Sequence, residues 1–249
     1  MNLIKIEKKV KQIIKRASKI YYHKKFFELY EKHKFEKDDV TNNDVATQNY
    51  IKAKLLKLIP GSSFIGEEGS QITDHKYVWI LDPIDGTQNY KRGLANYGTQ
   101  LALQYDGSTV LSVIYFPVFK EMYVANSNGA TLNGRPITVS KTTAVDWAVI
   151  AVNNYIRFFR TEKHKQLVYY MLDDAKSLRV TGCRALDFCT CAKGGFDALV
   201  VVGTTLWDFI PGQYLLQQAG GFNYVNKDLN LYISGNKEIV ENLKRILEV

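Results

Sequence analysis

The residues best suited to chemistry are two carboxylates, Asp82 and Asp85, in the segment WILDPIDGT. The apolar run 77–81 favours β-structure, so we expect a buried strand that ends in a carboxylate and turns sharply at Pro83. With the backbone carbonyl of Ile84, the two carboxylates form a set of hard oxygen ligands that suits Mg²⁺ and not soft metals. A plain turn is the alternative interpretation, because Asp, Pro and Gly all favour turns.

The next two residues, Gly86 and Thr87, extend this pattern. Gly86 has no side chain, which lets the backbone approach a ligand closely. We expect a short helix to begin near Thr87, and the free N–H groups at the start of a helix attract phosphate. The stretch therefore predicts a metal site next to an anion site.

Two further carboxylate clusters lie where strands are expected to end. Glu67 and Glu68 follow a short strand pattern that begins at Ser63, and Asp208 follows an apolar run and opens a helical pattern. In α/β proteins, sites form at the termini of strands and helices. The three clusters together therefore favour one shared site.

The order of these motifs resembles that of the inositol monophosphatase family of magnesium-dependent phosphatases. The motifs are GEEG (66–69), WILDPIDGT (79–87) and WD (207–208) before a helix that ends in QQAGG, and the resemblance runs from Val40 to Gly221. It implies a mixed α/β fold, the layered α/β/α/β/α sandwich of the sugar phosphatases. It also implies a phosphomonoesterase that hydrolyses a small phosphorylated metabolite with metal-activated water. That metabolite would be an inositol phosphate, a sugar phosphate or bisphosphate, or a 3′,5′-nucleotide.

The resemblance further implies two or three Mg²⁺ ions per active site and a ligand set for them. Glu67, Asp82 and the Ile84 carbonyl would hold the first ion. Asp82, Asp85 and Asp208 would hold the second, and Glu67 with waters would loosely hold a third.

The same resemblance gives the expected catalytic residues as Glu67, Thr87 and Asp44. Thr87 and Asp44 would orient the attacking water, and the amides of Gly86 and Thr87 would take the phosphate. Asp44 has an alternative interpretation as a partner of the helix dipole, because it lies in the first turn of a predicted helix. Glu68 is left outside the ligand set.

Two departures from the family pattern concern the substrate. The expected substrate-binding residues are Asp85, Gly86, Thr87, Gly182, Cys183, Arg184 and Asp208. Arg184 stands where a G-[ST]-A-A turn of the family has a small residue, and Val201 stands where inositol-preferring members have a Glu that binds substrate hydroxyls. If Arg184 points inward it offers a bidentate anion clamp, which favours a substrate with a second anionic group; the alternative is an Arg that points to solvent.

The rest of the sequence predicts the elements that position these residues. Residues 3–33 read as one long or broken amphipathic helix, and a second helix runs from about 43 to 58. Strand patterns separated by the turn signals Asp106-Gly107 and Asn133-Gly134 predict an antiparallel meander over 96–139.

In the second half, predicted strands alternate with helices. The strands are expected at 147–152, 177–180, 198–202 and 222–225, and a closing helix at 236–247. We place the boundary between two halves so that 1–142 carries the GEEG and DPIDGT motifs. The second half, 143–249, carries the WD motif and the substrate-facing elements.

Charge is concentrated at the start of the 249-residue chain. Residues 1–37 hold 12 Lys/Arg and 4 Glu, which accounts for the whole net charge of +8. Such a basic arm can bind nucleic acid or an anionic membrane. Apolar residues recur there at helical spacing, at Ile6, Val10, Ile13, Ala17 and Ile20. We therefore interpret the lysines as the solvated face of a packed helix, and we expect neither a membrane nor a nucleic-acid partner. The alternative function is a non-catalytic scaffold that binds nucleic acid through this helix.

The composition of the chain indicates where the protein is located in the cell. No apolar run is long enough to span a membrane, and no apolar stretch follows the basic N-terminus as in a signal peptide. Three clustered cysteines, Cys183, Cys189 and Cys191, are odd in number and indicate reduced, buried thiols. We expect a cytoplasmic homodimer that acts on a small phosphorylated substrate.

Overall fold

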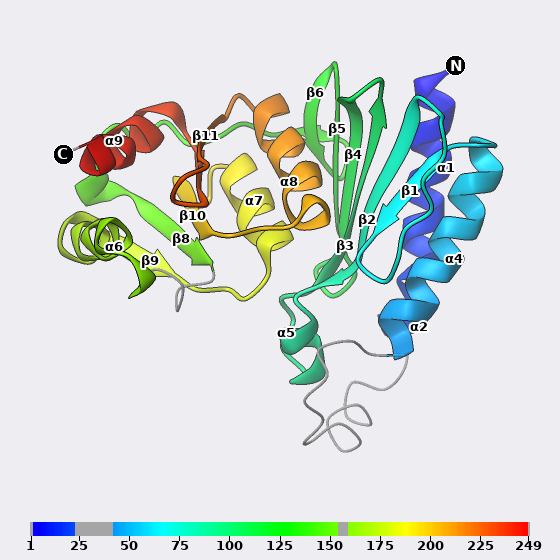
Figure 1. Ribbon diagram of the computed structural model, residues 1–249, viewed down its shortest axis with the longest axis horizontal. Helices are drawn as coiled ribbons and strands as arrows, with labels where there is room; N and C mark the ends of the chain where they lie inside the picture. The colour runs from blue at the N-terminus through cyan, green and yellow to red at the C-terminus, as the bar shows by residue number, and fades with distance from the viewer. Residues whose placement is uncertain (1, 23–41, 154–158, 249) are drawn as a thin grey trace.

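Helices and sheets alternate in layers through the molecule (Figure 1). The computed structural model describes residues 2–22, 42–153 and 159–248. A seven-stranded sheet and a five-stranded sheet lie on either side of a central helix layer, and further helices cover both outer faces. The predicted α/β/α/β/α sandwich is confirmed.

The first outer layer is formed by α1 (Leu3–Ala17) and α4 (Asn42–Leu58), with the short α2 (Lys19–Tyr22) between them. The buried side of α1 consists of Ile6, Val10, Ile14 and Ala17. The amphipathic pattern is thus confirmed, although Ile14 and not Ile13 is the fully buried residue. The helix expected over 3–33 is interrupted at Ser18, and its part beyond Tyr22 lies outside the described residues.

The first sheet contains seven strands in chain order. They are β1 (Ser63–Gly66), β2 (Tyr77–Asp85), β3 (Gly98–Tyr105), β4 (Ser108–Phe116), β5 (Glu121–Asn126), β6 (Gly129–Leu132) and β7 (Arg135–Pro136). β1 pairs with β2 in parallel and all other pairs are antiparallel, so the meander is confirmed. Asp106-Gly107 and Asn133-Gly134 form its tight turns with positive φ at all four residues, as Asn-Gly and Asp-Gly favour.

The turn expected at Pro83 is wrong, because β2 continues through Pro83 to Asp85. The ladder with β3 shifts register between Asp82 and Asp85, so the missing N–H of proline falls where regular pairing is interrupted. The chain turns later, at Gly86, before the short helix α5 (Thr87–Lys91).

The second sheet has the order β11-β12-β10-β8-β9. Its strands are β8 (Val149–Asn153), β9 (Ser177–Arg179), β10 (Ala198–Val202), β11 (Phe222–Asn226) and β12 (Leu231–Gly235). The sequence analysis missed β12, which lies between a turn and a helix. It pairs antiparallel with both β10 and β11, so partners far along the chain define it as a strand.

Further helical segments of the described residues complete the fold. They are η1 (Val145–Trp147), α6 (Glu162–Asp174), α7 (Arg184–Ala192), α8 (Leu206–Gln218) and α9 (Lys237–Glu248). α7 and α8 lie between the sheets, while α6 and α9 cover the outer face of the second sheet (Figure 1). Cys183, Cys189 and Cys191 are free and buried, as expected. Within the described ranges, no helix is both long and apolar enough to cross a membrane.

Candidate active site

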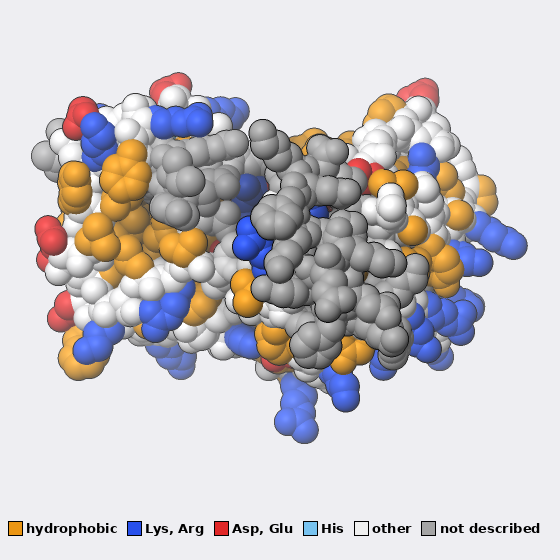
Figure 2. Space-filling model, turned by 90° about the horizontal axis from the view of Figure 1, so that it is seen from below, with side chains coloured by type: hydrophobic (Ala, Val, Ile, Leu, Met, Phe, Trp, Pro, Cys, Tyr) orange, Lys and Arg blue, Asp and Glu red, His pale blue; other side chains and the backbone are white. Residues whose placement is uncertain are grey.

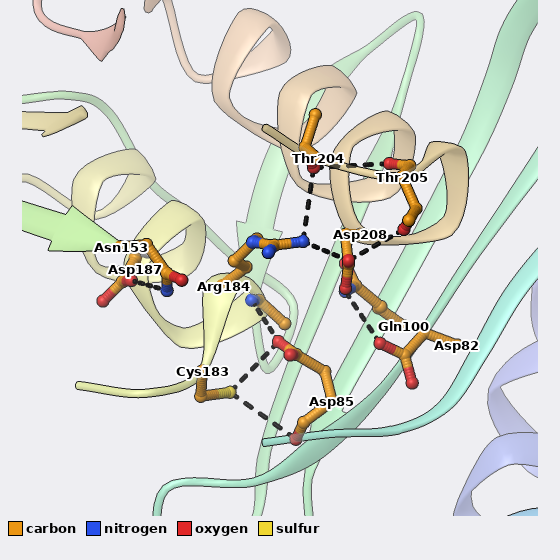
Figure 3. Close-up of polar contacts among 11 residues, drawn as sticks. Asp82, Asp85, Gln100, Asn153, Cys183, Arg184, Asp187, Thr204, Thr205 and Asp208 are labelled. Atoms are coloured by element: carbon orange, nitrogen blue, oxygen red, sulfur yellow. Dashed lines mark hydrogen bonds and ion pairs between the residues drawn. The ribbon is translucent and has the colours of Figure 1, made fainter. Parts of the chain in front are cut away.

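Three aspartates from two distant segments meet between the layers. Asp82 and Asp85 lie at the end of β2, and Asp208 lies in the first turn of α8 (Figure 3). One carboxylate oxygen from each lies within 4.8 Å of the others. Asp82 is 1% exposed and Asp85 8% exposed, so these negative charges are largely removed from water.

The backbone at the end of β2 brings the two aspartates to one point. The shifted register between Asp82 and Asp85 changes the strict alternation of side chains along the strand. Gly86 then adopts φ 84°, and a Cβ atom there would lie 2.5 Å from the carbonyl oxygen of Asn96. A glycine is therefore required at this position for close backbone packing as well as for the turn.

The aspartate cluster is electrostatically unsatisfied on its own. Burial and the negative charge of Asp85 raise the pKa of Asp82, and burial and the charge of Asp208 raise that of Asp85 to about 6. Oδ1 of Asp82 is buried and has no hydrogen-bond partner among the described residues. Gln100 Nε2 reaches Asp82 Oδ2 only at 3.5 Å. A divalent cation would neutralise the charge and occupy this free oxygen, so the residues fit a hard metal ion.

Glu67 and Asp44 border the same cluster. Loss of water around its carboxyl group, followed by the charges of Asp208 and Glu68, raises the pKa of Glu67 to about 7. Asp44 is buried in the first turn of α4, and its charge also raises the pKa values of Glu67 and Glu68. The charge of Asp208 thus acts on Glu67, whereas the charge of Asp44 acts on Glu67 and Glu68.

Gln48, which the sequence analysis missed, fixes the loop that carries these glutamates. Its Nε2 donates to the carbonyl of Gly69 at 3.1 Å, and its Oε1 accepts from the amide of Glu68 at 3.1 Å. Gln48 lies one helical turn after Asp44 on the buried side of α4. That i, i+4 spacing was the available signal, because it puts both side chains on one helix face.

Thr87 lies at the start of α5 beside the carbonyl assigned to a metal. Its hydroxyl donates to the carbonyl oxygen of Ile84 at 2.9 Å. A carbonyl oxygen has two lone pairs, so this hydrogen bond leaves one available for a cation.

The segment 181–185 approaches Asp85 from the other side. Cys183 Sγ donates to Asp85 Oδ2 at 3.2 Å, and the amide of Ala185 donates to the same oxygen (Figure 3). Gly182 has φ 72° and lies against the Asn89 side chain. Asn89 Nδ2 donates to the carbonyls of Asn96 at 2.8 Å and of Thr181 at 2.9 Å, and so joins α5 to this segment.

Arg184 points inward, so the interpretation of a solvent-facing side chain is wrong. Its Nη1 forms an ion pair with Asp208 Oδ2 and lies 3.4 Å from Thr204 Oγ1 (Figure 3). The Arg184 side chain is 14% exposed and that of Asp208 18%. Thr205 Oγ1 donates to the same carboxylate oxygen at 2.8 Å.

Asp187 is a second polar residue that the sequence analysis missed. It is buried in the first turn of α7, and burial raises its pKa to about 7. Thr181 Oγ1 donates to it at 2.6 Å and Asn153 Nδ2 at 3.0 Å. Asp187 therefore ties segment 181–185 to β8. The sequence shows only a single Asp in an apolar helix, and this pattern does not distinguish a buried Asp from a solvated one.

Val201 is part of the apolar core between the sheets. It is fully buried in β10 and belongs to a cluster with Phe209 and Tyr232. It offers no acceptor for a substrate hydroxyl, which agrees with the departure noted from the sequence.

Comparison with known proteins identifies the family. The profile described as the inositol monophosphatase family matches residues 2–248. The chain belongs to the inositol monophosphatase family. The relative named inositol-1-monophosphatase from Rhizobium meliloti (strain 1021) is 30% identical over 222 residues, which cover 85% of this chain and 83% of that protein. The Nus factor SuhB of Pseudomonas aeruginosa is 31% identical over 202 residues, covering 74% of this chain and 71% of the relative.

Solved structures of the family share the whole architecture. The native crystal structure of the extragenic suppressor protein suhB from Bartonella henselae has a TM-score of 0.87 at 26% identity, and 98% of each chain is covered. The inositol monophosphatase from Anabaena has a TM-score of 0.84 at 25% identity, covering 100% of this chain and 97% of the other. Membership of this family supports a metal-dependent phosphatase. The relatives' names differ, so they do not fix the substrate.

Proposed function

We propose that this protein is a Mg²⁺-dependent phosphomonoesterase. The observation that carries the proposal is the cluster of Asp82, Asp85 and the partly buried Asp208, in which one oxygen of Asp82 has no hydrogen-bond partner within the described part of the chain. When bound, divalent cations neutralise phosphate oxygens, acidify a water molecule and stabilise the leaving alkoxide. That chemistry addresses the main obstacle to hydrolysis, the repulsion between a negative ester and its nucleophile.

The residues of the chain would divide the remaining tasks among them. Asp82, Asp85, Asp208, Glu67 and the Ile84 carbonyl would hold the cations. Thr87 and Asp44 would orient the attacking water; the hydrogen bond of Thr87 to the Ile84 carbonyl and the effect of Asp44 on Glu67 support this assignment. The amides of Gly86 and Thr87 would hold the phosphate.

The test of this function is phosphate release from a panel of compounds, with and without Mg²⁺. The panel should contain inositol 1-phosphate, sugar monophosphates and bisphosphates, a 3′,5′-nucleotide and histidinol phosphate. We expect release that requires Mg²⁺ and stops with a chelator. Release that is unaffected by the chelator, or none from any compound, would contradict the proposal.

Within this panel we propose a preference for a substrate with a second anionic group. Arg184 is directed into the site and can bind an anion through two parallel hydrogen bonds. Val201 cannot accept a hydrogen bond, and leaving a polyol hydroxyl unpaired costs about 1–3 kcal/mol. We expect inositol 1-phosphate to be turned over poorly, and Arg184→Ala to abolish the preference while sparing small monophosphates. Inositol 1-phosphate as the best substrate would refute this specificity.

A second candidate function is nucleic-acid binding through α1. Two adjacent grooves, of about 430 Å³ and 380 Å³, share Lys15, Met122 and Asn133, and further lysines line them. Figure 2 shows Lys and Arg side chains gathered on the side of the molecule that carries α1 and α4. Some relatives are named Nus factor SuhB. Single-stranded RNA binding that weakens steeply with salt, and is lost on reversing the charges of Lys8 and Lys15, would support this function.

A further inference from the structure

Arg184 and the proposed cation site share one partner, the carboxylate of Asp208. Oδ2 of Asp208 accepts from Arg184 Nη1 and from Thr205 Oγ1 (Figure 3). The same side chain supplies one of the three oxygens that lie within 4.8 Å of one another. Among the described residues, Arg184 is the only basic side chain that forms an ion pair with Asp82, Asp85 or Asp208.

The guanidinium group of Arg184 places one positive charge beside the Asp208 carboxylate, where a divalent cation would place two. The ion pair with Asp208 is largely shielded from water, because the Arg184 side chain is 14% exposed and that of Asp208 18%. A guanidinium and a metal ion that are held by the same carboxylate weaken each other's binding, because the two cations repel each other at close range and share one negative charge.

The position of Arg184 leaves its own hydrogen bonding incomplete. Nε is buried and has no partner among the described residues, and Nη1 reaches the Thr204 hydroxyl only at 3.4 Å. Arg normally binds a carboxylate or phosphate through two parallel N–H bonds. The ion pair with Asp208 uses one of its nitrogens, so an incoming anion could offer a more complete set of acceptors.

We propose that Arg184 and a divalent cation compete for Asp208, and that cation binding releases Arg184 toward an anionic group of the substrate. This inference rests on the proposed function. Arg184 is then a positioning and specificity residue, and its binding partner depends on whether a cation occupies the site. Because linkage is reciprocal, an anion bound by the released Arg184 would strengthen cation binding by the same factor by which the cation strengthens anion binding.

The test is equilibrium Mg²⁺ binding to the chelator-treated full chain, by calorimetry and without substrate. Arg184→Met keeps most of the length of the side chain and removes its charge, and we expect it to bind Mg²⁺ about 10-fold more tightly. Arg184→Lys keeps the charge and should stay closer to the unchanged protein. Arg135→Met is the control. Arg135 is exposed in β7, so this substitution removes the same charge from the protein surface.

Thermal unfolding provides a second readout that does not depend on turnover. Arg184→Met should lower the melting temperature of the metal-free protein, since the aspartates lose their internal counter-charge, and Mg²⁺ should raise it by more than in the unchanged protein. Equal or weaker Mg²⁺ binding by Arg184→Met, with the unchanged protein binding normally, would overturn this inference alone. No Mg²⁺ binding by the unchanged protein would overturn the proposed function as well.

Discussion

Asp82 is a buried carboxylate with one oxygen that no described protein group satisfies. We predict that Asp82→Asn, which keeps the shape of the side chain but removes its charge, lowers turnover by about 10³-fold or more, a loss of about 4 kcal/mol in transition-state stabilisation. Steady-state phosphate release measures the effect, and circular dichroism checks that the variant is folded. A folded variant with near-normal turnover would show that the cluster is not the site of catalysis.

The hydroxyl of Thr87 donates a hydrogen bond to the Ile84 carbonyl. A substitution at Thr87 can test whether this hydroxyl also positions the attacking water. We predict that Thr87→Ala lowers kcat and leaves KM nearly unchanged, because positioning the water matters mainly in the transition state. Thr87→Ser is the control, since it retains the hydroxyl. A raised KM with an unchanged kcat would instead assign Thr87 to phosphate binding.

The carboxyl cluster also makes stability depend on pH. In the metal-free protein the pKa values of Glu67 and Asp85 are raised to about 7 and about 6, from ordinary values of 4.5 and 3.8. The folded state therefore binds more protons than the unfolded state, and this contribution to stability is lost as pH rises from about 4 to about 7. Bound Mg²⁺ favours the charged carboxylates and should remove the decline. Urea unfolding at pH about 4 and about 7, with chelator and with Mg²⁺, measures the decline in the free energy of unfolding. The same decline with chelator and with Mg²⁺ would contradict the prediction.

At the scale of the element, helix α1 packs apolar side chains on one side and exposes charged side chains on the other. Ile14 is fully buried against the first sheet, whereas the adjacent Lys15 is exposed. We predict that Ile14→Ala lowers the free energy of unfolding by about 2–5 kcal/mol, because it leaves a cavity. Lys15→Glu is the matched control and should change stability little, with phosphatase activity unchanged. Urea unfolding and phosphate release measure the two effects; large activity loss in Lys15→Glu would give the basic face a direct role.

At the scale of the whole molecule, the site exists only where two distant parts of the chain meet. Asn89 is one such connection, since it holds the carbonyl of Thr181 across the interface. We predict that Asn89→Ala lowers kcat by about 10-fold to 100-fold, because segment 181–185 loses its alignment with Asp85. Mg²⁺ binding, measured by calorimetry, should be largely retained. Normal kcat in a folded Asn89→Ala protein would show that this connection is not needed for positioning.

The sequence by itself determined the local patterns and the motifs of this protein. The apolar run before Asp82, the Asp-Gly and Asn-Gly turns and the periodicity of α1 all depend on neighbours a few residues away, and each is found as an element of the structure. The ordered motifs also identified the family. These features can be predicted because strand alternation, turn conformation and helical spacing are short-range properties of the chain.

Only the tertiary structure decided which side chains share the site and in what state. Arg184 points to Asp208 because α7 and α8 pack side by side, and Cys183 bonds to Asp85 across 98 residues of chain. The strand β12 and the course of β2 through Pro83 likewise depend on pairing with distant strands. Burial, charge pairing and ladder register are properties of contacts between segments, and no local pattern specifies which segments will meet.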